Sequence, residues 1–137
     1  MSNEAALNLS AAGAANPAAS TEPLGPTDWG HNYVDIAAMP WSPSRTPGSE
    51  QKVLYADAAT GMSTVLFRVQ PGGVIPFHEH PEIEQTYVFK GRLVDHMGEC
   101  TAGNFVFRSG GSRHSAHCPD GAEFMVFFMK PPKRLPL

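Results

Sequence analysis

Two histidines near the middle of the chain, His78 and His80, have the spacing of a metal-binding pair. They lie two residues apart in a run that is typical of a β-strand, and alternate side chains of a strand point to the same face. Two neutral imidazoles on one face can bind a transition metal, because imidazole is a ligand for many of these ions. The pair therefore predicts part of a metal site.

Glu84 and His114 are candidates for the remaining ligands. Pro81 ends the strand that carries the two histidines, and a new strand begins near Glu84, so strand alternation does not determine where Glu84 points. His114 follows a glycine turn later in the chain. A β-barrel could bring all four side chains to one interior point. The spacing alone does not show that it does, and Glu82 is a second nearby carboxylate.

The elements that must position these residues are short β-strands. Apolar runs separated by Gly, Pro and Asp turns recur at spacings near ten residues, which is typical of a β-sandwich or β-barrel. The predicted strands cover residues 33–37, 51–56, 63–70, 74–80, 84–89, 93–97, 104–107, 113–117 and 123–130. Every residue from Phe124 to Met129 is apolar, which indicates a strand covered on both faces, by the barrel core and by a partner subunit.

Composition excludes several classes of protein. The 137 residues fit one domain, and 42% hydrophobic with 17% charged residues is typical of a folded soluble chain. A net charge of −3 favours neither nucleic acid nor an anionic membrane, and no apolar run reaches the roughly 20 residues of a spanning helix. Cys100 and Cys118 are too few for a disulfide framework, and the first basic residue, Arg45, comes too late for a secretory signal. We therefore expect a cytoplasmic protein that binds neither nucleic acid nor membranes.

The first 28 residues differ in composition from the rest of the chain. They contain eight alanines, and Gly13, Pro17, Pro23 and Pro26 interrupt any helix. Such a segment buries too little apolar area to offset its ordering entropy. We expect residues 1–28 to be a flexible tail rich in Ala, Pro and Asn, or an arm that docks on a partner subunit. Residues 29–137 are expected to form one β-domain.

Two segments of this domain resemble the sequence motifs of the cupin superfamily. The first motif is a glycine, His-x-His, a glutamate and a second glycine at fixed spacing, and its matches are Gly72, His78, His80, Glu84 and Gly91. The second motif is matched by Gly103, Gly111 and His114. Ser109 stands where the family usually has Pro, and Cys118 where it usually has Asn.

The resemblance implies a jelly-roll β-barrel with one divalent metal ion inside, bound by His78, His80, Glu84 and His114. Such a ligand set favours Fe(II), with Zn(II), Mn(II) and Ni(II) as alternatives. It leaves one or two positions at the metal for water, dioxygen or substrate. Small cupins of this kind are commonly dimers, so we expect a homodimer.

The remaining polar residues fit structural roles better. His31, His96 and His117 match no motif position and are expected to be structural or at the surface. Arg68 could reach an anionic substrate, but an ordinary surface arginine is the favoured interpretation. Core packing is the favoured role of Tyr87 and of Cys118.

Within the superfamily, residues 64–73, 84–93 and 101–108 resemble one branch. It contains the cupin half of ChrR-type anti-sigma factors and small acetylacetone-cleaving dioxygenases. The diketone-cleaving members lack the metal-binding glutamate, which this sequence keeps as Glu84. The resemblance implies a non-haem metal-dependent oxygenase acting on a small oxygenated organic molecule. The alternatives are a non-catalytic zinc-binding sensor and a metal-dependent isomerase or lyase.

Overall fold

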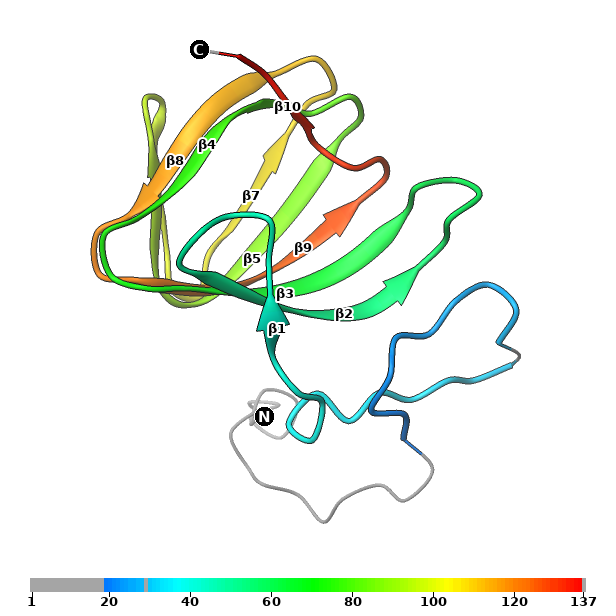
Figure 1. The fold of residues 1–137 in the computed structure, drawn as a ribbon. Coiled ribbons are helices and arrows are strands. Elements are labelled where there is room, and N and C mark those ends of the chain that lie inside the picture. Colours follow the sequence, from blue (N-terminus) through cyan, green and yellow to red (C-terminus); the bar gives the residue numbers. More distant parts are fainter. Residues whose placement is uncertain (1–18, 29, 137) are drawn as a thin grey trace, which may run out of the picture.

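The computed structural model describes residues 19–28 and 30–136, which contain β-strands and no helix. The strands form one antiparallel sheet that curls into a barrel (Figure 1), which confirms the predicted all-β jelly-roll class. They are β1 (Ser42–Pro43), β2 (Ser49–Ala56), β3 (Ser63–Val69), β4 (Gly73–Glu79), β5 (Glu84–Asp95), β6 (Gly98–Thr101), β7 (Phe105–Arg108), β8 (Arg113–Cys118), β9 (Ala122–Phe128) and β10 (Lys133–Arg134). The described part of the chain has no helix long and apolar enough to cross a membrane.

Strand β5 joins the two sides of the barrel. Its first half pairs with β7 and β9, and its second half pairs with β6 and β8. The prediction of two strands, 84–89 and 93–97, separated by a turn is wrong, because one strand runs from Glu84 to Asp95. The ladder to β9 shifts register between Val88 and Lys90. The chain therefore bends at this point without reversing direction.

The other strand predictions fall into two groups. Those at 51–56, 63–70, 74–80, 104–107, 113–117 and 123–130 are confirmed with ends that differ by at most two residues. The strand at 33–37 is wrong, because Asp35 closes a turn in which its carboxylate accepts the N–H of Ala38 and its carbonyl accepts the N–H of Met39. The short strand β6 was not predicted, and it forms a hairpin with the end of β5.

The segment before β1 packs on the outside of β2 (Figure 1). Of the predicted tail 1–28, residues 1–18 lie outside the described residues. Leu24 is hydrogen-bonded to β2, donating to the carbonyl of Leu54 at 3.1 Å and accepting from the N–H of Ala56 at 2.9 Å. Further along, Lys52 of β2 donates to the carbonyl of Ile36 at 2.6 Å. The Leu24 bonds extend the edge of β2, and the Lys52 bond holds the segment against its outer side.

Strand β9 shows how the core is divided from the surface. Phe124 and Val126 are 5% and 2% exposed and belong to the main core cluster, whereas Phe127 is 43% exposed on the other face. Cys118 is fully buried in the same cluster. The described residues leave Phe127 on the outer face of β9 exposed. The homodimer stays a prediction.

The close approach of β5 to the β8–β9 turn gives a first prediction. Gly91 has φ of 67°, and an added Cβ would collide with the carbonyl oxygen of Gly121. We predict that Gly91→Ala destabilises the protein by about 3 kcal/mol or more, because backbone strain and a steric clash add. The measurement is urea unfolding followed by circular dichroism.

Gly72→Ala is the matched control. Gly72 has φ of 78°, but nothing lies within 4 Å of an added Cβ. Backbone strain is then the one cost, and we expect Gly72→Ala to destabilise the protein by about 1 kcal/mol. Equal losses in the two variants would contradict a role for the close approach.

Candidate metal centre

Three histidines converge inside the barrel. His78 on β4 and His114 on β8 are direct partners in the antiparallel ladder. His80 follows the end of β4, where its N–H donates to the carbonyl of Ser112 at 2.9 Å and its carbonyl accepts the N–H of Gly111 at 2.6 Å. One ligand nitrogen from each imidazole lies within 4.8 Å of the others. A single ion with bonds of about 2.1 Å can bridge such a group after small side-chain rotations.

The hydrogen bonds of the three imidazoles leave the same nitrogen of each ring available. Each Nδ1 lies against an oxygen: His78 against the Pro76 carbonyl at 2.7 Å, His80 against Glu84 at 2.9 Å, and His114 against Asp95 at 2.9 Å. Because these oxygens accept, each Nδ1 carries the proton and each Nε2 keeps its lone pair. His80 Nε2 is buried without a hydrogen-bond partner among the described residues. A buried acceptor of this kind is costly, and a divalent metal ion held by the three Nε2 atoms would satisfy it.

Burial also sets the protonation of the cluster. Burial, together with the nearby Arg108 charge, lowers the pKa of His114 to about 4. Burial lowers the pKa of His78 as well. Both imidazoles are therefore neutral at pH 7, which is the form that binds metal.

Glu84 reaches the cluster from the start of β5. Its side chain is only 10% exposed, and Oε2 lies 2.9 Å from Nδ1 of His80. Its other oxygen lies 3.7 Å from Nη1 of Arg108, the cross-strand neighbour of Glu84 on β7. The structure therefore places Glu84 against the Nδ1 side of the His80 ring. The group of possible ligand atoms within 4.8 Å of one another contains the three histidines and not Glu84, so Glu84 as a metal ligand stays a prediction.

Two members of the cluster, Asp95 and Arg108, were missed from the sequence. Arg108 Nη2 lies 3.4 Å from Asp95 Oδ2, so this guanidinium stands between the two carboxylates that hold His80 and His114. Burial acts to raise the pKa of Asp95, but hydrogen bonds from a backbone N–H and from His114 outweigh it and lower the pKa. A signal for Asp95 was present, because it follows the buried Leu93 by two residues and so faces the interior.

A cavity of about 360 Å³ adjoins the cluster. His78, Glu84, Arg108 and His114 line its polar end. Most of its wall is apolar and consists of Val65, Phe67, Ile75, Phe124, Val126 and Phe128. The exposed residues of the loop after β1 and of the segment 131–134 form its rim. A cavity of this size and lining holds a small organic molecule.

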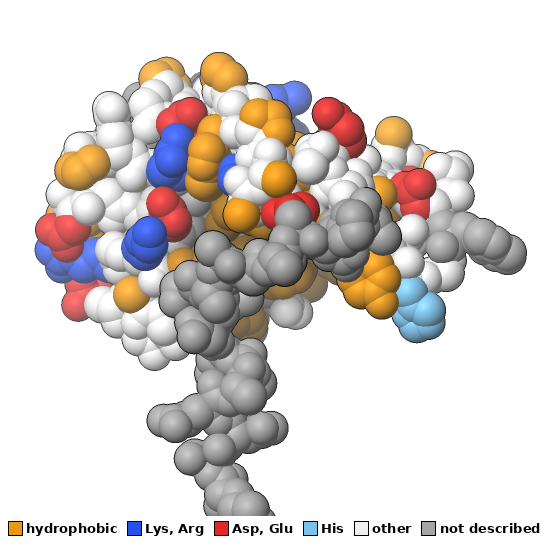
Figure 2. Space-filling model, turned by 90° about the horizontal axis from the view of Figure 1, so that it is seen from below, with side chains coloured by type: hydrophobic (Ala, Val, Ile, Leu, Met, Phe, Trp, Pro, Cys, Tyr) orange, Lys and Arg blue, Asp and Glu red, His pale blue; other side chains and the backbone are white. Residues whose placement is uncertain are grey.

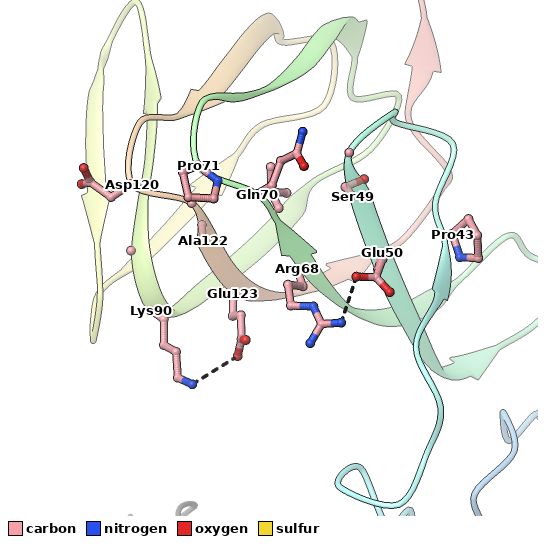
Figure 3. Close-up of a pocket in the computed structure, with 14 residues that line it drawn as sticks. Pro43, Ser49, Glu50, Arg68, Gln70, Pro71, Lys90, Asp120, Ala122 and Glu123 are labelled. Atoms are coloured by element: carbon pink, nitrogen blue, oxygen red, sulfur yellow. Dashed lines mark hydrogen bonds and ion pairs between the residues drawn. The ribbon is translucent and has the colours of Figure 1, made fainter.

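Arg68 lies away from this cavity, on the outer surface. Its Nη2 is 2.8 Å from Oε1 of Glu50, and its guanidinium lies 4.2 Å from the ring centre of Trp41. Figure 3 shows the Arg68–Glu50 pair and the Lys90–Glu123 pair beside a surface depression. On the left of the view in Figure 2, basic and acidic side chains lie side by side. This position, away from the histidines and paired with Glu50, fits the interpretation of Arg68 as an ordinary surface arginine.

The structure also places the residues that were assigned structural roles. His31, His96 and His117 are exposed. Cys118 is buried in the core, and burial raises the pKa of its thiol to about 11. Tyr87 is half-buried and packs edge-on against Phe89, with ring centres 4.9 Å apart. None of the five lines the cavity beside the histidines.

Sequence comparison identifies the family. The model of the ChrR cupin-like domain matches residues 30–132, and the chain therefore belongs to this family of cupins. No curated protein matches the sequence.

Comparison with solved structures agrees with this assignment at the level of the fold. A candidate acetylacetone dioxygenase from Methylibium petroleiphilum PM1 is similar with a TM-score of 0.74 and 21% identity, over 80% of this chain and 84% of that one. An acetylacetone dioxygenase from Acinetobacter johnsonii is similar with a TM-score of 0.71 and 20% identity, over 80% of each chain. A chain in the complex of Rhodobacter sphaeroides SigE with the anti-sigma ChrR is similar with a TM-score of 0.58 and 18% identity, over 68% of this chain and 50% of that one.

The contact between Asp95 and His114 gives a second prediction. Asp95→Asn keeps the shape of the side chain but removes the charge that orients the imidazole. We expect metal affinity to fall by about tenfold to a hundredfold. Competition with a chromogenic chelator measures this. Asp120→Asn is the control, because Asp120 is exposed and pairs with Arg92, and its affinity should equal that of the wild type. An unchanged metal affinity in Asp95→Asn would show that Asp95 does not orient His114 for metal binding.

Proposed function

We propose that this cupin is a metal-dependent oxygenase that acts on a small oxygenated organic molecule. In this proposal His78, His80 and His114 bind one divalent ion through Nε2, and Glu84 contributes its carboxylate to the site. Fe(II) is the favoured ion, with Zn(II), Mn(II) and Ni(II) as alternatives. A bound ion of this kind would supply a Lewis acid and, as Fe(II), redox chemistry toward dioxygen.

The observation that carries the proposal is the position of the histidines at one end of an apolar cavity. A metal site that serves only to stabilise a fold is closed by protein ligands, whereas a catalytic site keeps space for substrate. Here the cavity of about 360 Å³ touches His78 and His114 directly. The two acetylacetone dioxygenase-type structures named above share this fold, which supports the same chemical class.

The residues of the chain have separate roles in this proposal. Pro76, Glu84 and Asp95 hold the three Nδ1 atoms and fix the orientation of the rings. Arg108 balances the two carboxylates. The aromatic and aliphatic wall excludes water from the substrate and aligns its apolar part. No general base is assigned.

A zinc-binding sensor is the second candidate, and the family match favours it. The family is described by its likeness to ChrR, and one similar structure contains ChrR as an anti-sigma protein bound to SigE. A sensor would use the same histidines with Zn(II) and would not consume dioxygen. A metal-dependent isomerase or lyase would also leave dioxygen untouched but would convert a substrate.

Metal analysis and oxygen uptake separate these functions. We expect protein purified without added metal to contain iron, and to consume dioxygen with acetylacetone or a dihydroxyaryl ketone. Zinc at full occupancy with no oxygen uptake would overturn the oxygenase proposal. His114→Ala should lose the metal because it removes a ligand. His117→Ala, on the outward face of the same strand, should retain it.

Glu84 has its own test, because Glu82 is a matched control. Glu84 is buried at the cluster and Glu82 is exposed two residues earlier. We expect Glu84→Gln to weaken metal binding by about tenfold or more, since it removes the charge that contacts His80. Glu82→Gln should change nothing. The visible spectrum of Co(II)-loaded protein reports the ligand geometry in both variants. If the two variants have equal affinities, Glu84 is not part of the metal site.

A further inference from the structure

The arginines of the chain divide into two groups. The sequence has six, and four of them pair with carboxylates: Arg68 with Glu50, Arg92 with Glu99 and Asp120, Arg108 with Glu84 and Asp95, and Arg113 with Glu79. Among the described residues, Arg45 and Arg134 have no ion-pair partner. These two are also the arginines that lie at the rim of the cavity beside the histidines.

Arg134 is placed at the rim by strand pairing. It lies on β10, directly opposite His78 of β4 in the antiparallel ladder, and the N–H of Leu135 donates to the carbonyl of Phe77 at 3.2 Å. Side chains of directly opposed residues share one face of a sheet. Arg134 therefore lies on the cavity side of β10, whereas its neighbour Lys133 pairs with Glu79 and lines no part of the cavity.

Arg45 reaches the same rim from the loop between β1 and β2. The loop is held by its own hydroxyl groups. Ser44 Oγ accepts the N–H of Thr46 at 3.0 Å and contacts the hydroxyl of Ser49, which donates to the carbonyl of Thr46 at 2.8 Å. Arg45 is thus carried by an ordered turn and lines the same cavity as Arg134 of β10.

The charges in the cavity leave a net positive rim. Glu84 is the one acidic residue in the lining, and it already contacts His80 and Arg108. Guanidinium groups bind carboxylates through charge-assisted hydrogen bonds. The apolar wall between the rim and the histidines suits a hydrocarbon or aromatic body and does not suit a strongly hydrated polyanion.

We propose that Arg134 and Arg45 bind the carboxylate of a small organic acid whose apolar body fills the cavity and whose far end meets the histidine cluster. This rests on the proposed function, because it takes the cavity beside the histidines as the substrate site. It makes Arg134 and Arg45 the residues that determine specificity for an anionic substrate.

Two probes of equal shape test the inference. 4-Acetylbenzoate carries a carboxylate at one end and a carbonyl at the other, and 4-acetylbenzamide is its neutral counterpart. Calorimetric titration of the full chain should give about tenfold tighter binding of the carboxylate. Arg134→Gln and Arg45→Gln should each reduce this preference about threefold, and the double variant should abolish it. The affinity for the amide should not change.

Lys133→Gln is the matched control, since it removes an equal charge from the same strand but from the other face. It should keep the wild-type preference. The inference is overturned if the wild type binds the two probes equally, or if Lys133→Gln loses as much preference as Arg134→Gln.

The titration is repeated on chelator-treated protein, which separates this inference from the proposed function. A carboxylate preference in protein that takes up no metal would sustain the role of the arginines and remove the metal proposal. Metal uptake and oxygen consumption without a carboxylate preference would sustain the metal proposal and remove the role of the arginines.

Discussion

The pairing of β4 with β8 is the constraint on which the rest of the site depends. Its register shifts between Ile75 and His78, at a point where Pro76 has no N–H to give to the ladder. In a regular strand Ile75 and His78 would point to opposite faces, yet both line the cavity. The irregularity therefore turns His78 inward, opposite His114. Pro76 also supplies the carbonyl that holds His78 Nδ1. One local departure from regular pairing both aims and orients an imidazole.

The second requirement is that buried charges balance. Glu84 and Asp95 carry negative charge into the barrel to hold His80 and His114, and an isolated buried carboxylate would be strongly destabilising. Arg108 lies between them, with a side chain 13% exposed, and leaves one net negative charge. A divalent cation at the three Nε2 atoms would compensate that charge. The same arrangement keeps His78 and His114 neutral, because burial disfavours their protonated form.

The sequence predicted those parts of the site that follow from strand alternation or from motif spacing. His78 and His80 both follow the register shift in β4. Strand alternation therefore predicts correctly that the two side chains share a face, although no local pattern marks the shift. Glu84 follows a turn, and only family spacing placed it near the others. Arg108 was missed because its role depends on the pairing of β7 with β5, which no local pattern encodes. No local pattern predicts that β5 continues through Lys90 and Gly91 either. The strand stays unbroken there because Gly91 packs closely against Gly121, which is distant in the sequence.

The oxygenase and sensor functions make different demands on the space around the metal. A sensor or structural zinc site is best served by complete coordination and a filled interior, since every void in a core costs dispersion contacts. This barrel instead keeps a cavity against two of its histidines and opens it between the loop after β1 and β10. Those two segments lie at opposite ends of the domain sequence, so the opening is a product of the whole fold. An apolar cavity that adjoins the histidines in this way can bind a small molecule, and it is the reason that the catalytic proposal stands first.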